Sequence, residues 1–170
     1  MPEIEKLFIK YASGIHHLLL KLTKSEDTAD DLVQEVFMQL IKYYKPNVKN
    51  ERAYIYSIAY NIFKRYYKKT KEGKVVFSDM AGTIADKKNH YEDIDWQHIR
   101  EAIIKKLEDE NKTYAPLFIL RIDAELTYEE LSIICGISKR TVLRYFENIR
   151  KLIIDNFKED ISGLKNWRNK

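Results

Sequence analysis

The sequence has little of what stabilises small secreted or metal-bound proteins. Its 170 residues include a single cysteine, Cys135, which excludes an internal disulfide and any zinc site built from several cysteines. No apolar run approaches the roughly 18 residues that a membrane-spanning helix needs. The first residues, MPEIEKLFIK, are acidic where a signal peptide is basic. We therefore expect a cytoplasmic protein without membrane insertion.

A recognisable set of catalytic or metal-binding residues is also lacking. His16 and His17 are adjacent, and side chains about 100° apart on a helix cannot hold one metal ion together. Cys135 lies among leucine and isoleucine residues, as a small core residue does. Asp31 and Glu35 could share a divalent ion, but no further ligand motif accompanies them. We expect no catalytic residue, no metal and no cofactor.

Charge is distributed unevenly along the chain, although the net charge is only +4. Residues 1–44 contain five Lys or Arg and seven Asp or Glu, whereas residues 45–71 contain eight basic residues and one acidic residue, Glu51. A local basic field attracts phosphate whatever the rest of the molecule carries. This asymmetry favours a nucleic-acid partner for the segment that follows Tyr44.

The basic segment contains an aromatic helix, ERAYIYSIAYNIFKRYYKK, at residues 51–69. Its apolar positions recur at the spacing of one helical face, which we expect to be core: Ala53, Ile55, Ile58, Ala59, Ile62 and Tyr66. The other face carries rings that can stack on bases and cations that can neutralise phosphates: Tyr54, Ser57, Tyr60, Asn61, Lys64, Arg65 and Lys68. The alternative is that the tyrosines pack at the rim of a core and the basic residues are merely solvated.

Two further helices precede this one, over residues 4–22 and 25–44. Their apolar stripes repeat every three to four residues and comprise Ile4, Leu7, Phe8, Tyr11, Ile15, Leu18, Leu19 and Leu22 in the first, and Ala29, Leu32, Val33, Val36, Phe37, Leu40, Ile41 and Tyr44 in the second. Gly14 weakens the first helix slightly. Ser25 is expected to cap the second helix, and Pro46 to end it.

After residue 70 the periodicity is lost, and a second helical segment begins near Asp95. Thr127 and Glu130 form a capping-box pattern, and Gly136 is expected to end that short helix. Ser138 then caps another helix. Helix, glycine-containing turn and helix at this spacing predict a helix-turn-helix unit, although tight helical corners also occur in proteins that never bind DNA.

Three segments together resemble the signatures of a known family. TADDLVQEVF (residues 28–37), ERAYIYSIAYN (51–61) and LTYEELSIICGISKRTV (126–142) are similar to segments of bacterial sigma factors of the extracytoplasmic-function type. The resemblance implies an all-α fold of two small helical domains. These are a region 2 bundle at residues 1–70 and a region 4 helix-turn-helix domain at residues 95–170, joined by a flexible linker at residues 71–94.

The resemblance also implies partners and site residues. Binding to the clamp helices of the largest polymerase subunit is expected of Asp31, Gln34, Glu35 and Gln39. Binding and melting of the −10 element is expected of Tyr44, Lys45, Asn47, Lys49, Asn50, Tyr54, Tyr56, Tyr60, Asn61, Lys64, Arg65 and Lys68. Binding of the −35 element is expected of Ser138, Lys139, Arg140, Thr141, Arg144 and Tyr145. The region 4 domain is further expected to meet the flap of the second-largest subunit, and the DNA to be double-stranded upstream and single-stranded where it opens.

The chain departs from the family pattern in two places. Arg65 stands where relatives commonly have an aspartate, and Ser57 and Tyr60 stand where they have arginines. In the recognition helix Leu143 and Tyr145 replace basic residues. The chain therefore either reads a different upstream sequence or depends on an auxiliary DNA-bound recruiter, and an anti-sigma factor is another possible partner.

Three classes of function follow from the sequence. The first is promoter recognition as a subunit of RNA polymerase. A free-standing helix-turn-helix regulator would explain the second domain but leaves the acidic face of residues 28–39 without a role. A carboxylate-metal nuclease would require ligands beyond Asp31 and Glu35.

Overall fold

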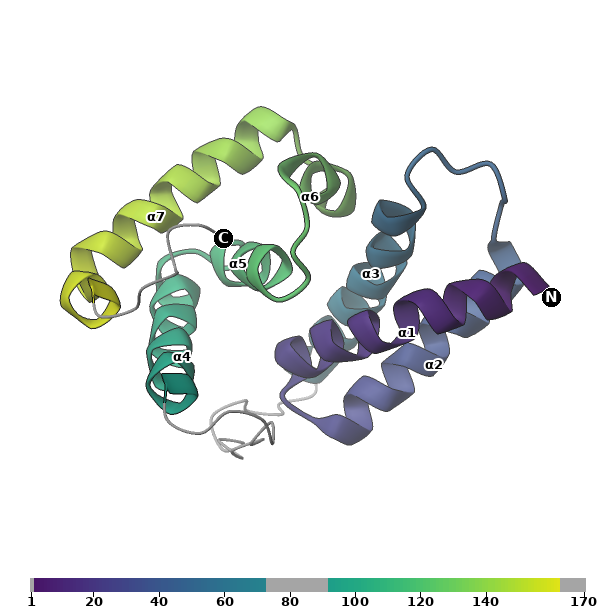
Figure 1. Ribbon diagram of the computed structural model, residues 1–170, viewed down its shortest axis with the longest axis horizontal. Coiled ribbons are helices and arrows are strands. Elements are labelled where there is room, and N and C mark those ends of the chain that lie inside the picture. The colour runs from purple at the N-terminus through teal and green to yellow at the C-terminus, as the bar shows by residue number, and fades with distance from the viewer. Residues whose placement is uncertain (1, 73–91, 163–170) are drawn as a thin grey trace.

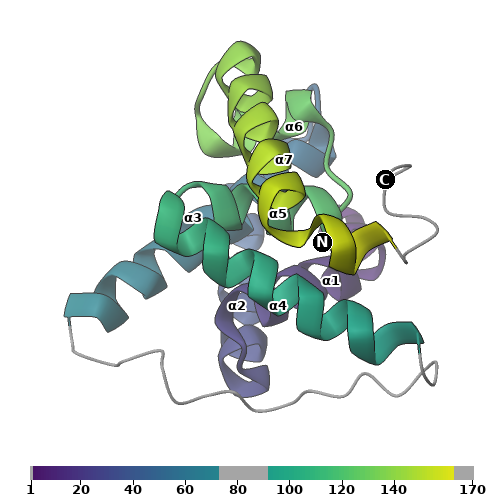
Figure 2. The same cartoon turned by 90° about the vertical axis from the view of Figure 1, so that its left-hand side faces the viewer.

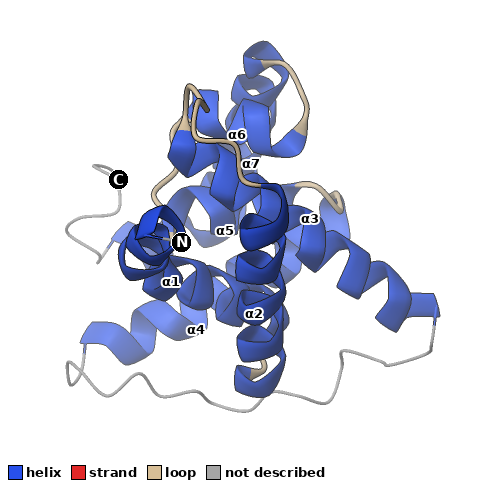
Figure 3. Ribbon diagram, turned by 90° about the vertical axis from the view of Figure 1, so that its right-hand side faces the viewer, coloured by secondary structure: helices blue, strands red, loops and turns tan. Residues whose placement is uncertain are grey.

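The protein is entirely helical over the residues that its structure describes (Figures 1 and 3). The computed structural model describes residues 2–72 and 92–162, which form seven α-helices and contain no strand. Most of the predicted linker, residues 73–91, lies outside the described residues. None of the described helices is long and apolar enough to cross a membrane.

The first three helices form one bundle. Helix α1 spans Pro2–Thr23, α2 spans Glu26–Tyr43 and α3 spans Glu51–Glu72. The predicted cap of α2 is confirmed, because Ser25 Oγ accepts a hydrogen bond from the backbone N–H of Thr28 at 3.3 Å. Such a cap satisfies one of the four free N–H groups that begin every helix.

The core of this bundle is built from the predicted apolar stripes. Side chains from all three helices are almost fully buried, and these are Leu7, Ile15, Leu18, Leu19, Ala29, Val36, Leu40, Ala53, Ile55, Ala59 and Ile62. Two members of the stripes are not core. Phe8 is 50% exposed and Ile41 is 58% exposed. A three-helix bundle covers only part of each helix surface, so apolar positions at the edge of a stripe remain in solvent.

The remaining four helices form the second unit, and their bounds are α4 Glu92–Glu110, α5 Tyr114–Ile122, α6 Tyr128–Cys135 and α7 Lys139–Ser162. The capping box of α6 is confirmed, since Thr127 Oγ1 accepts from the Glu130 N–H at 3.2 Å and Glu130 Oε2 accepts from the Thr127 N–H at 2.8 Å. Gly136 ends α6 in the left-handed conformation, with φ 65°. Helices α6 and α7 thus form the predicted helix-turn-helix corner.

The two units pack directly against each other. Helix α6 lies along α3, and α5 lies against α1. Both contacts can be followed in Figures 1 and 2, where α6 is beside the first half of α3. The sequence predicted two domains joined by a linker, and it contained no local signal for this interdomain contact.

Candidate nucleic-acid interface

The loop that precedes α3 is held by contacts at both of its ends. Tyr44 caps the end of α2, and its ring lies 6.2 Å from the ring of Tyr54, centroid to centroid. Asn50 Oδ1 accepts a hydrogen bond from the backbone N–H of Ala53 at 2.9 Å. Asn50, predicted to meet DNA, therefore has a structural role in starting α3. Between these ends Lys45, Asn47 and Lys49 are exposed.

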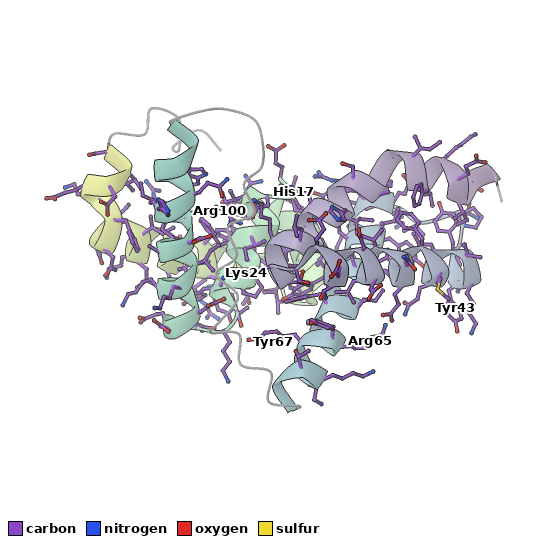
Figure 4. All side chains as sticks on the ribbon, turned by 90° about the horizontal axis from the view of Figure 1, so that it is seen from below. His17, Lys24, Tyr43, Arg65, Tyr67 and Arg100 are labelled. Atoms are coloured by element: carbon purple, nitrogen blue, oxygen red, sulfur yellow. The ribbon has the colours of Figure 1, made fainter. Side chains whose placement is uncertain are left out.

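The second half of α3 presents the polar and cationic side chains that the sequence placed there. Asn61, Lys64, Arg65 and Lys68 are exposed, and Tyr54 is half-buried. Arg65 and Tyr67 lie toward the C-terminal end of α3, whereas Tyr43 lies at the opposite end of the bundle (Figure 4). An exposed amide and several cations on one helix can bind both bases and phosphates.

Two tyrosines of the predicted −10 set are not on an exposed face in this arrangement. Tyr56 is only 5% exposed and Tyr60 only 8% exposed. Burial raises the pKa of both phenols above the ordinary value, since a charged phenolate is disfavoured away from water. The placement of Tyr60 on the solvent side of α3 was therefore wrong here. The reason is that α6 covers this side of the helix, which a helical period cannot reveal.

The acidic face of α2 is confirmed as accessible. Asp31 and Gln34 are exposed, and Glu35 and Gln39 are partly exposed. Glu35 Oε1 lies 2.8 Å from Arg65 Nη2, so this carboxylate already has a cationic partner in α3. The predicted polymerase-binding face and the predicted −10 face therefore meet at the Glu35–Arg65 pair, where α2 packs on α3.

Ligand-type side chains come together elsewhere than at Asp31 and Glu35. Among the described residues, the group able to hold a metal ion is His16, Glu26 and Asp30. His16 Nε2 lies 3.3 Å from Glu26 Oε1 and 3.1 Å from Asp30 Oδ1, which is the geometry of ion pairs between α1 and α2. His17 is not part of the group, in keeping with the expectation that the two histidines cannot act on one ion.

The start of α7 carries the predicted −35 set. Ser138 Oγ accepts from the Thr141 N–H at 3.1 Å and so caps the helix. Lys139 forms an ion pair with Glu129 of α6, while Arg140 and Arg144 are exposed. Tyr145 is half-buried, with its ring 5.6 Å from that of Tyr114 in α5.

One residue in the contact between the units escaped the sequence reasoning. The Arg52 guanidinium donates a hydrogen bond to the backbone carbonyl of Ala124 at 2.5 Å, and its Nη1 lies 3.5 Å from Glu130 Oε2. Glu130 is 6% exposed, a low value for a carboxylate. Buried charges are normally paired, but no residue near Arg52 or Glu130 in the sequence indicates that the two side chains meet.

Comparison with known proteins gives three similarities. Residues 7–72 match the family model of sigma-70 region 2. The ECF RNA polymerase sigma factor SigM of Bacillus subtilis (strain 168) is 24% identical over 139 residues, which is 80% of this chain and 83% of that protein. The sigma factor RpoE, in a co-crystal structure with the anti-sigma factor NepR from Bartonella quintana, has the same fold. Its TM-score is 0.68 at 18% identity, over 94% of this chain and 99% of that one.

Proposed function

We propose that the chain is a sigma factor of the sigma-70 family, of the extracytoplasmic-function type, and that it binds core RNA polymerase with α2 and promoter DNA with α3 and α7. Transcription initiation is the process in which it acts. The finer assignment divides the molecule into residues 1–70 for polymerase and the −10 element, and residues 95–170 for the −35 element. The place of action is then the bacterial cytoplasm, where polymerase and chromosome are.

The observation that carries the proposal is the arrangement of α2 and α3 side by side. The exposed face of α2 carries Asp31 and Glu35, and the exposed half of α3 carries Asn61 and Lys64. An acidic surface suits a basic partner protein, and the neighbouring polar and cationic surface suits DNA. One small bundle can therefore hold polymerase on one helix and nucleic acid on the next.

Strand opening in this proposal needs binding energy and no bond chemistry. Unpaired bases of the non-template strand would be held against Tyr54 and Asn61, and the loop of residues 44–50 would form a pocket for a flipped base. Stacking on an aromatic side chain contributes about 1 to 3 kcal/mol per base. Capture of several unstacked bases offsets the free energy of unpairing, which is a few kcal/mol per flipped nucleotide.

An inhibitory partner is also proposed. The structural neighbour RpoE was crystallised with the anti-sigma factor NepR. A sigma factor of this type restrained by such a protein would be released when a signal removes the restraint. At the start of α7, Leu143 and Tyr145 replace basic residues of the family pattern. A separate DNA-bound protein that recruits the chain is therefore a second candidate partner.

The alternative function is a free-standing helix-turn-helix regulator. It accounts for α6 and α7 but gives no role to the exposed carboxylates of α2. An experiment with core RNA polymerase from the host and fragmented genomic DNA, carried out with and without the full chain, distinguishes the sigma factor from the regulator. A sigma factor co-elutes with core enzyme and creates new transcript start sites, whereas a regulator binds DNA without core and alters only transcription that another sigma factor initiates.

A further inference from the structure

The rotation of α7 about its axis is fixed by the side of the helix that is packed in the protein. Val142 has no exposed surface, Ile149 is 2% exposed, and the ring of Phe146 lies 5.2 Å from the ring of Tyr128 in α6. These α7 residues recur every three to four positions, as one side of a helix does. The opposite side of the first turns of α7 therefore faces away from the protein.

The outward side of α7 carries one apolar side chain among charged ones. Arg140, Leu143, Arg144 and Glu147 are all exposed, and they follow the spacing of three and four residues that places side chains on one helix face. Leu143 is 40% exposed. A single exposed leucine is common on protein surfaces, so its meaning depends on where it lies.

Leu143 lies in the part of a helix-turn-helix unit that meets base edges. It is in the second turn of α7, which begins at Lys139, and the first turns of the second helix are those that enter the major groove in this motif. The neighbouring Tyr145 cannot take that role, because its ring packs on Tyr114 with centroids 5.6 Å apart. Arg140 and Arg144 beside Leu143 are suited to phosphates.

The chemistry of leucine restricts what it can recognise in the groove. Its side chain has no hydrogen-bonding atom, and the apolar group that a base pair offers in the major groove is the C5-methyl of thymine. Against guanine or adenine, the leucine would cover polar base edges without replacing their hydrogen bonds to water, which is unfavourable. Leu143 therefore favours thymine over the other bases at the pair it touches.

We propose that Leu143 is a specificity-determining residue that contacts the methyl group of a thymine in the upstream element, while Arg140 and Arg144 bind phosphates beside it. The family pattern has a basic residue at this position, so the apolar contact is a property of this chain. The inference rests on the part of the proposed function that assigns duplex DNA to α7. A sigma factor and a free-standing regulator share that part.

The test removes the methyl group from the DNA and the leucine from the protein. The full chain, in the presence of core RNA polymerase, first selects duplexes from a library randomised over the upstream element. Each thymine of the enriched motif, on either strand, is then replaced singly by deoxyuridine, which keeps the base-pair hydrogen bonds and lacks only the methyl group. Competition binding compares each pair of duplexes.

At one thymine, wild type should bind the deoxyuridine duplex about fourfold more weakly, which is the effect of one methyl group returned to water. Leu143→Ala should bind the two duplexes equally. Leu143→Met keeps an apolar side chain of similar volume and should keep the preference. Ile133→Ala is the matched control, because it removes another exposed apolar side chain, 55% exposed, from α6, the helix that crosses the DNA backbone in this motif. It should keep the full preference.

Three results would overturn the inference. These are an enriched motif in which no thymine is sensitive to loss of its methyl group, a selection that enriches nothing upstream, and a methyl preference that survives in Leu143→Ala. Transcript start sites made by core enzyme with the wild-type chain are mapped in parallel. If the methyl preference depends on Leu143 but no new start site appears, the inference stands and the proposed function fails. If start sites appear at promoters whose upstream thymines are insensitive, the proposed function stands and the inference fails.

Discussion

The hydroxyl group of Tyr56 in α3 lies where a side chain on Gly14 of α1 would be. A Cβ atom at position 14 would be 2.6 Å from Tyr56 Oη and 3.8 Å from Cζ. Tyr56 is 5% exposed, so its ring has little freedom to move away. Gly14 is therefore the position at which α1 makes room for α3, a role that its sequence context did not reveal.

Gly14→Ala should destabilise the protein, but only while Tyr56 keeps its hydroxyl. Alanine gains about 1 kcal/mol over glycine in a helix interior, and an overpacked contact costs about 1 to 3 kcal/mol. In a Tyr56→Phe background the nearest ring atom is at ordinary contact distance, so the same change should be neutral or stabilising. Urea unfolding of the four variants measures this, and the same destabilisation in both backgrounds would show that the close contact is relieved in some other way.

Local signals predicted local structure well. The caps at Ser25 and Thr127 follow from side chains that bond the backbone within a few residues, and the cap at Gly136 follows from the ease with which glycine adopts a positive φ. Each is confirmed. The accessibility of Tyr60 was not predictable in the same way, because it depends on α6, which lies far along the chain. The pairing of Arg52 with Ala124 has no local signature at all. The exposure of the site residues was thus predictable where helix periodicity determines it, and it was not predictable where one helical unit covers the other.

The acidic face of α2 gives a prediction about polymerase. Asp31→Lys combined with Glu35→Lys should abolish binding to core enzyme, because two exposed carboxylates are replaced by charges that repel a basic partner. The fold should survive. The change removes the exposed Glu35 to Arg65 ion pair, and such pairs contribute only about 0.2 to 1 kcal/mol. Gel filtration with core enzyme measures the binding, and circular dichroism checks the fold.

Arg65→Gln is the matched control for that experiment, since it removes the same ion pair and leaves the carboxylates in place. It should co-elute with core enzyme as wild type does. Near wild-type affinity of the double lysine variant would show that docking uses another face.

Glu51 should give the protein a pH-dependent increment of stability. Its Oε1 accepts from Lys10 Nζ and from Tyr11 Oη, each at 2.9 Å, and these two hydrogen bonds lower the pKa of the carboxyl from 4.5. A carboxyl whose pKa is lower when folded stabilises the native state above the unfolded pKa, and loses that effect as pH falls through the folded pKa.

Glu51→Gln should therefore lower the free energy of unfolding by about 0.2 to 1 kcal/mol at neutral pH, a small value because the site is partly exposed. The difference from wild type should shrink below about pH 4.5. Urea unfolding between neutral and acid pH measures it, with Glu147→Gln as an exposed control. A difference that stays constant down to the lowest pH would mean that Glu51 acts through its shape and not its charge.

Tyr54, near the start of α3, and Asn61, in its middle, give a prediction about strand opening. Tyr54→Ala and Asn61→Ala should reduce open-complex formation on duplex promoters much more than on templates with a premade bubble, because the bubble removes the unpairing energy that captured bases must offset. Permanganate footprinting on the two templates measures the difference. Asn156→Ala is the control, since that amide bonds only its own helix at Leu152. Equal defects on both templates would leave α3 with a role in general DNA affinity alone.

The start of α7 gives the last prediction, which concerns how upstream DNA is recognised. If Lys139, Arg140 and Arg144 chiefly contact phosphates, alanine at each should weaken binding almost uniformly across sequences and lower the salt slope by about one unit per contact. If one arginine instead makes a bidentate contact to guanine, its loss should cost about 1 to 3 kcal/mol at a single base pair and relax specificity only there.

The contacts of the recognition helix favour the phosphate outcome. Tyr145 packs its ring on Tyr114, and Arg144 lies 5.8 Å from the centroid of that Tyr145 ring, so the aromatic residue is held in the protein and does not extend toward base edges. Lys139 is already paired with Glu129. Selection of a promoter library by the holoenzyme decides between the two. A sharp upstream motif that disappears with Arg144→Ala would establish direct reading, whereas enrichment confined to the −10 region would mean that another DNA-bound protein supplies the upstream specificity.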